Sequence, residues 1–255
     1  MKIRLDNGLI LGGEEIQIQS ISGLETPAVR TGSGIYAGAD GGYVVSQFYG
    51  TRTIVVKGFF IGRCSSEMND KRQSFLRRLP LRYIFGITIE DFEQQYWYTE
   101  GYVSDIKCEI TAPRVGEYQI TILCPDPLIY HATGWLTNSP VVTNQSLTAN
   151  GQTTFLVGGN AQIFPTYRLT GDFSSNWGIR IGEDKCAFTR SWAATMLIDM
   201  KERTAKTEDN VSILQTRTTD SVWLPLNPGA VTVEIFGLNS AVSASVYFKE
   251  GFRGI

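Results

Sequence analysis

Apolar and polar residues alternate with a period of two in several parts of the chain. Because successive side chains of a strand point to opposite faces of a sheet, this pattern predicts strands with one buried and one exposed face. The clearest stretches are residues 15–19, 105–110, 117–122, 231–235 and 242–249. Residues 111–116 and 237–240 separate neighbouring stretches and contain turn-forming residues, so hairpins are expected there. Antiparallel hairpins favour sandwiches or barrels over a parallel α/β sheet.

One helix is predicted over residues 67–79. Ser65 or Ser66 can cap it, and Glu67 lies where the positive end of the helix dipole favours a carboxylate. Pro80 follows directly and cannot continue a helix. Residues 193–208 are ambiguous between a second helix and a hairpin, and the apolar segment 195–200 followed by polar residues favours the hairpin.

Two prolines mark a boundary in the middle of the chain. Pro125 and Pro127 cannot donate to a sheet ladder, so the preceding strand must end there. Residues 134–159 are then rich in Thr, Asn, Ser and Gly before strand patterns resume. We therefore expect two β domains, at residues 1–130 and 131–255.

The composition predicts a chain with a packed core and no electrostatic attraction to nucleic acid or anionic membranes. Its 255 residues are 42% hydrophobic, and the net charge is −2. A local basic cluster is expected to be a solvated helix face. It consists of Lys71, Arg72, Arg77, Arg78 and Arg82. The first residues do not resemble a signal peptide, and no apolar run has the length of a membrane span. The four scattered cysteines fit reduced thiols in a cytoplasm.

The residues predict no catalytic, metal or cofactor site. His131 is the single histidine, and the cysteines form no C-x-x-C pair, so acid–base and zinc chemistry both lack partners. Residues 32–37 match G-x-G-x-x-A, but no helix can begin after them. Residues 104–107 match S-x-x-K on a strand, where Ser104 and Lys107 face opposite sides. We therefore expect a protein that is not an enzyme.

Carboxylates and aromatic residues leave two further alternatives. The carboxylates at 90–93 and 183–184 could form a glycosidase pair, but both groups have the character of solvated loops. Trp177 and Trp192, and separately the aromatic residues at 96–98, could stack on sugars. Aromatic residues on strands more commonly pack in the core or at an interface.

The order of several motifs resembles the distal tail protein family of siphophages. The chain has I-S-G-L at residues 21–24, D-G-G at 40–42, Thr51-Arg52, and then a strand that ends in Gly62. A short helix and a C-P-D-P junction at residues 124–127 follow in the family's order. Residues 197–199 and 223–229, with a final strand pair, are similar to the family's galectin-like C-terminal domain.

This resemblance implies a mainly β fold of two domains and a structural role. The N-terminal domain would be a ring-forming sandwich or split barrel with one short helix, and the C-terminal domain a galectin-like jelly-roll sandwich. The implied partners are five further copies in a hexameric ring, the tail tube protein, the tail-tip protein and, at the periphery, receptor-binding proteins. DNA would pass through the lumen unbound. The implied location is the virion's tail tip, after synthesis in the host cytoplasm.

Candidate site residues follow from the resemblance to distal tail proteins and from an alternative interpretation as a carbohydrate-binding module. The ring-interface candidates are Asp40, Gly41, Gly42, Tyr43 and Arg52, because the glycines suit a tight turn in an arm and the strand after Arg52 could pair with a neighbour. An ordinary hairpin turn would need the same glycines. In the alternative interpretation, a carbohydrate-binding module, Trp177 and Trp192 contact sugar.

Overall fold

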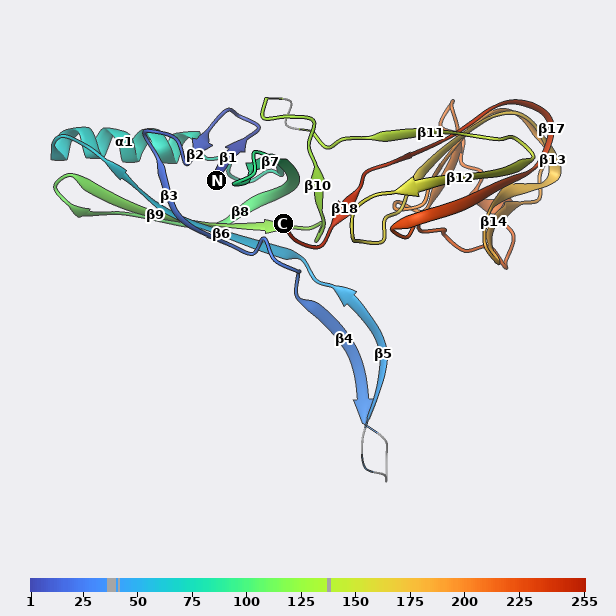
Figure 1. The fold of residues 1–255 in the computed structure, drawn as a ribbon, viewed down its shortest axis with the longest axis horizontal. Coiled ribbons are helices and arrows are strands. Elements are labelled where there is room, and N and C mark those ends of the chain that lie inside the picture. Colours follow the sequence, from blue (N-terminus) through green and yellow to red (C-terminus); the bar gives the residue numbers. More distant parts are fainter. Residues whose placement is uncertain (36–39, 41, 137–138) are drawn as a thin grey trace. The chain divides into compact units, whose positions relative to one another are not determined.

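Strands dominate both parts of the chain, as the alternating pattern predicts. The computed structural model describes residues 1–35, 40, 42–136 and 139–255. It divides into unit 1, formed by Met1–Pro140 and Phe252–Ile255, and unit 2, formed by Val141–Gly251. Figure 1 shows the elements of each unit. The predicted mainly β fold with one short α-helix in the N-terminal part is confirmed for the described residues.

Unit 1 is built on an antiparallel sheet with the strand order β2-β1-β7-β8-β9-β6-β3. Its strands are β1 (Lys2–Leu5), β2 (Ile10–Leu11), β3 (Gln17–Ser22), β6 (Arg52–Ile61), β7 (Phe85–Glu90), β8 (Tyr96–Ala112) and β9 (Val115–Cys124). β10 (Ile129–His131) pairs with β8 and with β18 (Gly251–Phe252). The division into two units thus falls ten residues after the expected boundary at residue 130, and β10 lies within unit 1.

The predicted pair of strands around residues 111–116 forms a tight hairpin of β8 and β9. Ala112 pairs with Val115, so the turn is shorter than the sequence indicates. β9 alternates buried and less buried residues, and Tyr118, Ile120 and Ile122 are among its buried positions. These side chains join the core of unit 1.

Helix α1 (Ser65–Arg78) covers part of this core. Met68 and Phe75 are buried, and the ring of Phe75 lies 4.9 Å from that of Tyr118. The expectation that Ser65 or Ser66 caps the helix is wrong, because Cys64 is the N-cap residue and makes no side-chain capping bond. Instead, the Glu67 carboxylate accepts the backbone N–H of Arg63 at 2.8 Å, which fixes the entry of the chain into the helix.

β4 (Val29–Ile35) and β5 (Gly42–Tyr49) form a separate two-stranded sheet. In Figure 1 they extend away from the main sheet of unit 1. The G-x-G-x-x-A match begins in β4, which is a strand that leads into no helix in the described part, so its rejection as a dinucleotide motif agrees with the structure. Residues 36 and 37 of that match lie outside the described residues.

Unit 2 is a second antiparallel sheet system with the strand order β11-β17-β13-β15-β16, in which β12 pairs with β17 and β14 with β13. Its strands are β11 (Thr143–Leu147), β12 (Gly151–Val157), β13 (Thr166–Ile181), β14 (Asp184–Phe188), β15 (Trp192–Asp199), β16 (Thr204–Thr207) and β17 (Gly229–Phe248). A short 3-10 helix, η1 (Leu214–Thr216), follows β16. The hairpin predicted within residues 193–208 is formed by β15 and β16, and the helical alternative is wrong.

The turn predicted at residues 237–240 is also wrong. These residues lie inside the continuous strand β17, which pairs with β13 on both sides of them. Gly237 has φ +76°, and a Cβ built on it would lie 2.1 Å from the carbonyl oxygen of Asn176. The register of β13 and β17 shifts between Phe173 and Gly178. The glycine thus allows an irregularity in a long strand pair, and the chain does not reverse there.

We predict that Gly237→Ala destabilises unit 2 more than Gly182→Ala does. Gly182 also has positive φ (+60°), but a Cβ there would have no heavy atom within 4 Å. Its substitution should cost about 1 kcal/mol from backbone conformation alone. Gly237→Ala adds a collision with backbone and should cost about 2–4 kcal/mol. Urea unfolding of both variants measures the difference, and equal midpoints would contradict a tight contact at Gly237.

Candidate functional site: the arm and its buried anchor

The hairpin formed by Val29–Ile35 and Gly42–Tyr49, which we call the arm, is unusually exposed for a pair of strands. Its register runs from Val29 opposite Tyr49 to Ile35 opposite Gly42, with a bulge after Gly32. The backbone N–H of Gly50 donates to Ala28 at 2.8 Å and closes the base. Neither strand pairs with another strand in the described part of the chain.

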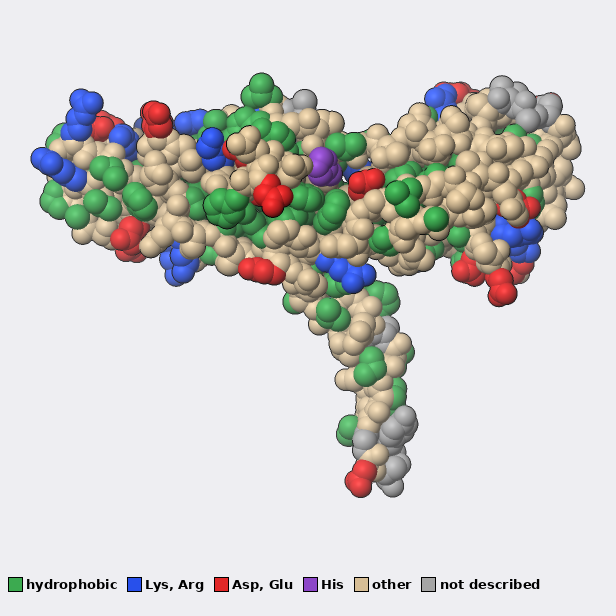
Figure 2. Space-filling model, viewed as in Figure 1, with side chains coloured by type: hydrophobic (Ala, Val, Ile, Leu, Met, Phe, Trp, Pro, Cys, Tyr) green, Lys and Arg blue, Asp and Glu red, His purple; other side chains and the backbone are tan. Residues whose placement is uncertain are grey.

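Large apolar side chains of the arm face solvent. The exposed fractions are 85% for Ile35, 72% for Val45, 66% for Phe48 and 60% for Val44. Figure 2 shows apolar side chains distributed along the arm, with few charges among them. A two-stranded hairpin in water is only marginally stable by itself, and contiguous exposed apolar surface marks sites of protein interaction. The arm therefore has the properties of an interface element.

The ring-interface candidates of the sequence fall into two groups. Gly42 and Tyr43 lie near the outer end of the arm, where the ring of Tyr43 lies so close to Gly34 that a Cβ there would meet it at 2.7 Å. A Cβ on Gly42 would lie 2.6 Å from the Gly34 carbonyl, so glycine lets the strands approach. Asp40 is exposed just before β5, and Gly41 lies outside the described residues.

Arg52 is not an exposed interface residue, because it is 2% exposed and bound within unit 1. Its Nη1 donates to the carbonyls of Gly23 at 2.7 Å and Glu25 at 2.6 Å. Its Nε donates to Pro127 at 2.9 Å, and its Nη2 to Arg253 at 2.5 Å. Burial lowers the pKa of the guanidinium, although an arginine stays charged at neutral pH. Arg52 therefore anchors both chain segments from which the arm emerges.

The motifs that carry the family resemblance converge around Arg52. Gly23 has φ +88°, and a Cβ on it would lie 1.9 Å from the carbonyl oxygen of Thr53. Asp126 accepts the backbone N–H of Leu128 at 3.0 Å and the hydroxyl of Tyr130 at 2.7 Å. The motifs of the resemblance therefore lie around Arg52. The sequence could not identify the acceptors of Arg52, because they are backbone carbonyl groups, which every residue has.

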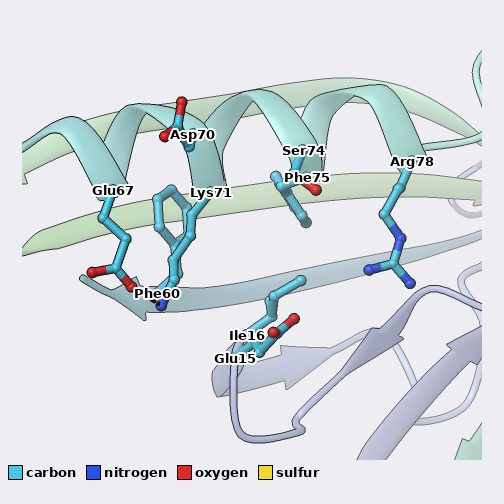
Figure 3. A pocket seen from close by; sticks show the side chains of 9 residues that line it. All are labelled: Glu15, Ile16, Phe60, Glu67, Asp70, Lys71, Ser74, Phe75 and Arg78. Atoms are coloured by element: carbon cyan, nitrogen blue, oxygen red, sulfur yellow. Dashed lines mark ion pairs between the residues drawn. The ribbon is translucent and has the colours of Figure 1, made fainter. Parts of the chain in front are cut away.

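A hollow of about 240 Å³ lies between α1 and the loop before β3 (Figure 3). Phe60, Phe75 and Ile16 give it an apolar floor, and charged residues of both signs surround it. Lys71 is occupied by Glu67 at 3.1 Å and by the carbonyl of Ile61 at 2.7 Å. Backbone and side-chain donors from Arg63 and Lys71 lower the pKa of Glu67.

Other candidate chemistry is accounted for by packing and turns. His131 packs edge-on against Trp97, with the ring centroids 5.4 Å apart. Asp91 accepts the indole N–H of Trp97 at 2.8 Å and two backbone N–H groups, so it stabilises the turn before β8. Within the described ranges, no group of three or more His, Cys, Asp and Glu residues could hold a metal ion. None of the described helices has the length and apolar character that a membrane span requires.

The two tryptophans of the sugar interpretation lie in different environments. Trp177 is 0% exposed, stacks with Phe188 at 4.6 Å and donates to the Arg190 carbonyl at 2.9 Å. It belongs to the core of unit 2 and cannot contact a sugar, which corrects its assignment. Trp192 is partly exposed and borders a surface hollow.

These features define a two-unit, mainly β protein with an exposed arm that is held at its base by a buried arginine. Among solved structures, the chain is similar to the crystal structure of the SPP1 Dit (gp 19.1) protein, described as a paradigm of the hub adsorption apparatus in phages that infect Gram-positive bacteria. The TM-score is 0.74, the identity is 16%, and the match covers 98% of both chains. The resemblance to the distal tail protein family is thus confirmed at the level of the fold.

Further matches are more distant. The phage P2 baseplate in its activated conformation with Ca gives a TM-score of 0.45 at 13% identity, with 100% of this chain and 98% of that chain covered. No family model matches the chain. No curated protein matches its sequence.

We predict that Arg52→Lys destabilises unit 1 by about 3 kcal/mol. A lysine keeps the charge, but its compact ammonium cannot replace a planar fork that reaches four carbonyls, so buried acceptors lose their donors. Urea unfolding, with hydrogen exchange of peptides from β6, measures the loss. Arg30→Lys on the exposed arm is the control and should stay within about 0.5 kcal/mol of wild type. The anchor role is wrong if both variants unfold at the same midpoint.

Proposed function

We propose that this chain is a structural distal tail protein, the baseplate hub of a phage with a long non-contractile tail. The similarity to the SPP1 Dit protein over 98% of both chains is the observation that carries this proposal. In this role the protein forms a hexameric ring between the tail tube and the tail-tip adsorption apparatus. It acts by binding other proteins and performs no catalysis.

The arm is the element that we assign to ring assembly. Docking on another copy would bury its exposed apolar side chains and pair the backbone groups of its two open strand edges. A contact between the arm of one copy and a different surface of the next is heterologous, and such contacts close into a ring when the rotation per subunit allows it. The buried Arg52 supports this assembly by fixing the base of the arm.

The remaining partners follow from the position of a hub. The ring would contact the tail tube protein on one side and the tail-tip protein on the other, with receptor-binding proteins at its periphery. DNA would cross the lumen without specific binding, with which the net charge of −2 is compatible. The protein would be made in the host cytoplasm and function at the tail tip of the virion.

We predict that the purified chain assembles into rings of six copies, alone or after addition of the tail-tip protein. Negative-stain electron microscopy shows the rings, and light scattering gives their mass. Particles that stay monomeric at high concentration, with and without the tail-tip protein, would refute the proposal.

We further predict that Val45→Lys or Phe48→Lys in the arm abolishes the rings and leaves the monomer folded. Both positions are exposed, so a lysine costs the monomer little but places a charge in the interface. Leu156→Lys is the matched control, since Leu156 is 75% exposed on β12 of unit 2. Light scattering should give monomers for the arm variants and wild-type mass for the control. Rings that persist in both arm variants would exclude the arm as the interface.

A further inference from the structure

Unit 2 carries a surface hollow where β13, β15 and β17 meet. It is shallow and wide open to solvent, with a volume of about 390 Å³. It is lined by Asp172, Phe173, Ser191, Trp192, Ala193 and Asn239. The strand register explains this grouping, because Phe173 pairs with Trp192 and Asp172 with Ala193.

Trp192 gives this hollow an aromatic wall. The side chain is only partly buried, yet its indole nitrogen is buried and has no acceptor among the described residues. Because the nitrogen is buried, a ligand in the hollow would meet the ring and not the N–H. The guanidinium of Arg190 lies 4.6 Å from the ring centroid and holds the indole in place. By contrast, the indole N–H of Trp177 is bonded to a carbonyl in the core.

The polar groups around the indole suit a ligand with several hydroxyl groups. The Asp172 carboxylate accepts hydrogen bonds, the Asn239 amide both donates and accepts, and the Ser191 hydroxyl does the same. These three residues are exposed and reachable by a ligand. A carboxylate at the wall disfavours phosphate ligands. The apolar lining is limited to Phe173, Trp192 and Ala193, and Phe173 is almost fully buried, so there is too little apolar surface for an acyl chain.

We propose that this hollow, which we call the Trp192 hollow, binds a neutral saccharide. The indole contacts the C–H groups of the sugar ring, and Asp172 and Asn239 bind its hydroxyl groups. This proposal stands on unit 2 alone, so it is independent of whether the chain forms rings. It also selects one of the two tryptophans that sequence reasoning treats alike.

The test is a glycan microarray of neutral hexoses, 6-deoxyhexoses and N-acetylhexosamines, probed with the full chain, followed by calorimetry with the best saccharide. Wild type should bind at least one class. Trp192→Ala and Asp172→Asn should each weaken the affinity about ten-fold or more. Trp192→Phe, which keeps an aromatic face but a smaller one, should lie between wild type and Trp192→Ala.

Trp223→Ala is the matched control. Trp223 is also partly exposed in unit 2 and also lies under an arginine, with Arg217 4.9 Å from its ring, but it does not line the hollow. Its substitution should leave saccharide affinity unchanged. Absence of binding by wild type to every saccharide on the array would overturn the proposal, as would wild-type affinity in Trp192→Ala. If Trp192→Ala fails to fold, the exposed Asp172→Asn decides, and undiminished affinity in it overturns the proposal.

Discussion

The Arg52 guanidinium donates hydrogen bonds to carbonyl groups from three separate parts of the chain: residues 23–25, Pro127 and Arg253. Burying a charge is costly unless its donors are satisfied, and buried carbonyls are costly without donors. The buried guanidinium and the buried carbonyl groups therefore stabilise each other. Removal of the arginine would leave four acceptors with little access to water, so the segments could not keep their positions at the same free energy.

Arg52 also lies where the buried part of unit 1 meets the exposed arm. β6 begins at Arg52 and is buried along one face, whereas the arm ends three residues earlier and is exposed along most of its length. An element with many exposed backbone hydrogen bonds and little buried apolar surface opens at low free energy. If the arm docks on another copy, as proposed, its strands could adapt to that surface while the base near Arg52 stays fixed, and the fixed base would limit the entropy lost on docking.

Sequence patterns identified the strands of both units because one buried face imposes the period of two, as at Tyr118, Ile120 and Ile122. They failed where the same residue types occur both in turns and in irregular strands. A glycine followed by Leu, Asn and Ser is typical of a turn, yet Gly237 uses its positive φ to pass an irregularity in β13. The arm is a second example. The sequence grouped Gly42, Tyr43 and Arg52 as interface candidates, but it could not show that Arg52 is buried at the base while the other two lie on the exposed hairpin.

The two tryptophans show why a site is harder to predict than a strand. Trp177 and Trp192 both lie on strands of unit 2, and the same packing preference applies to each. Their roles differ because Trp177 lies between Phe173 and Phe188 and donates to a backbone carbonyl, whereas Trp192 ends beside a hollow with its N–H unpaired in the described structure. That difference depends on long-range strand register, which one sequence does not encode locally. The fold therefore has to be known before an aromatic residue can be assigned to the core or to the surface, and in this chain it places Trp177 in the core and leaves Trp192 partly exposed.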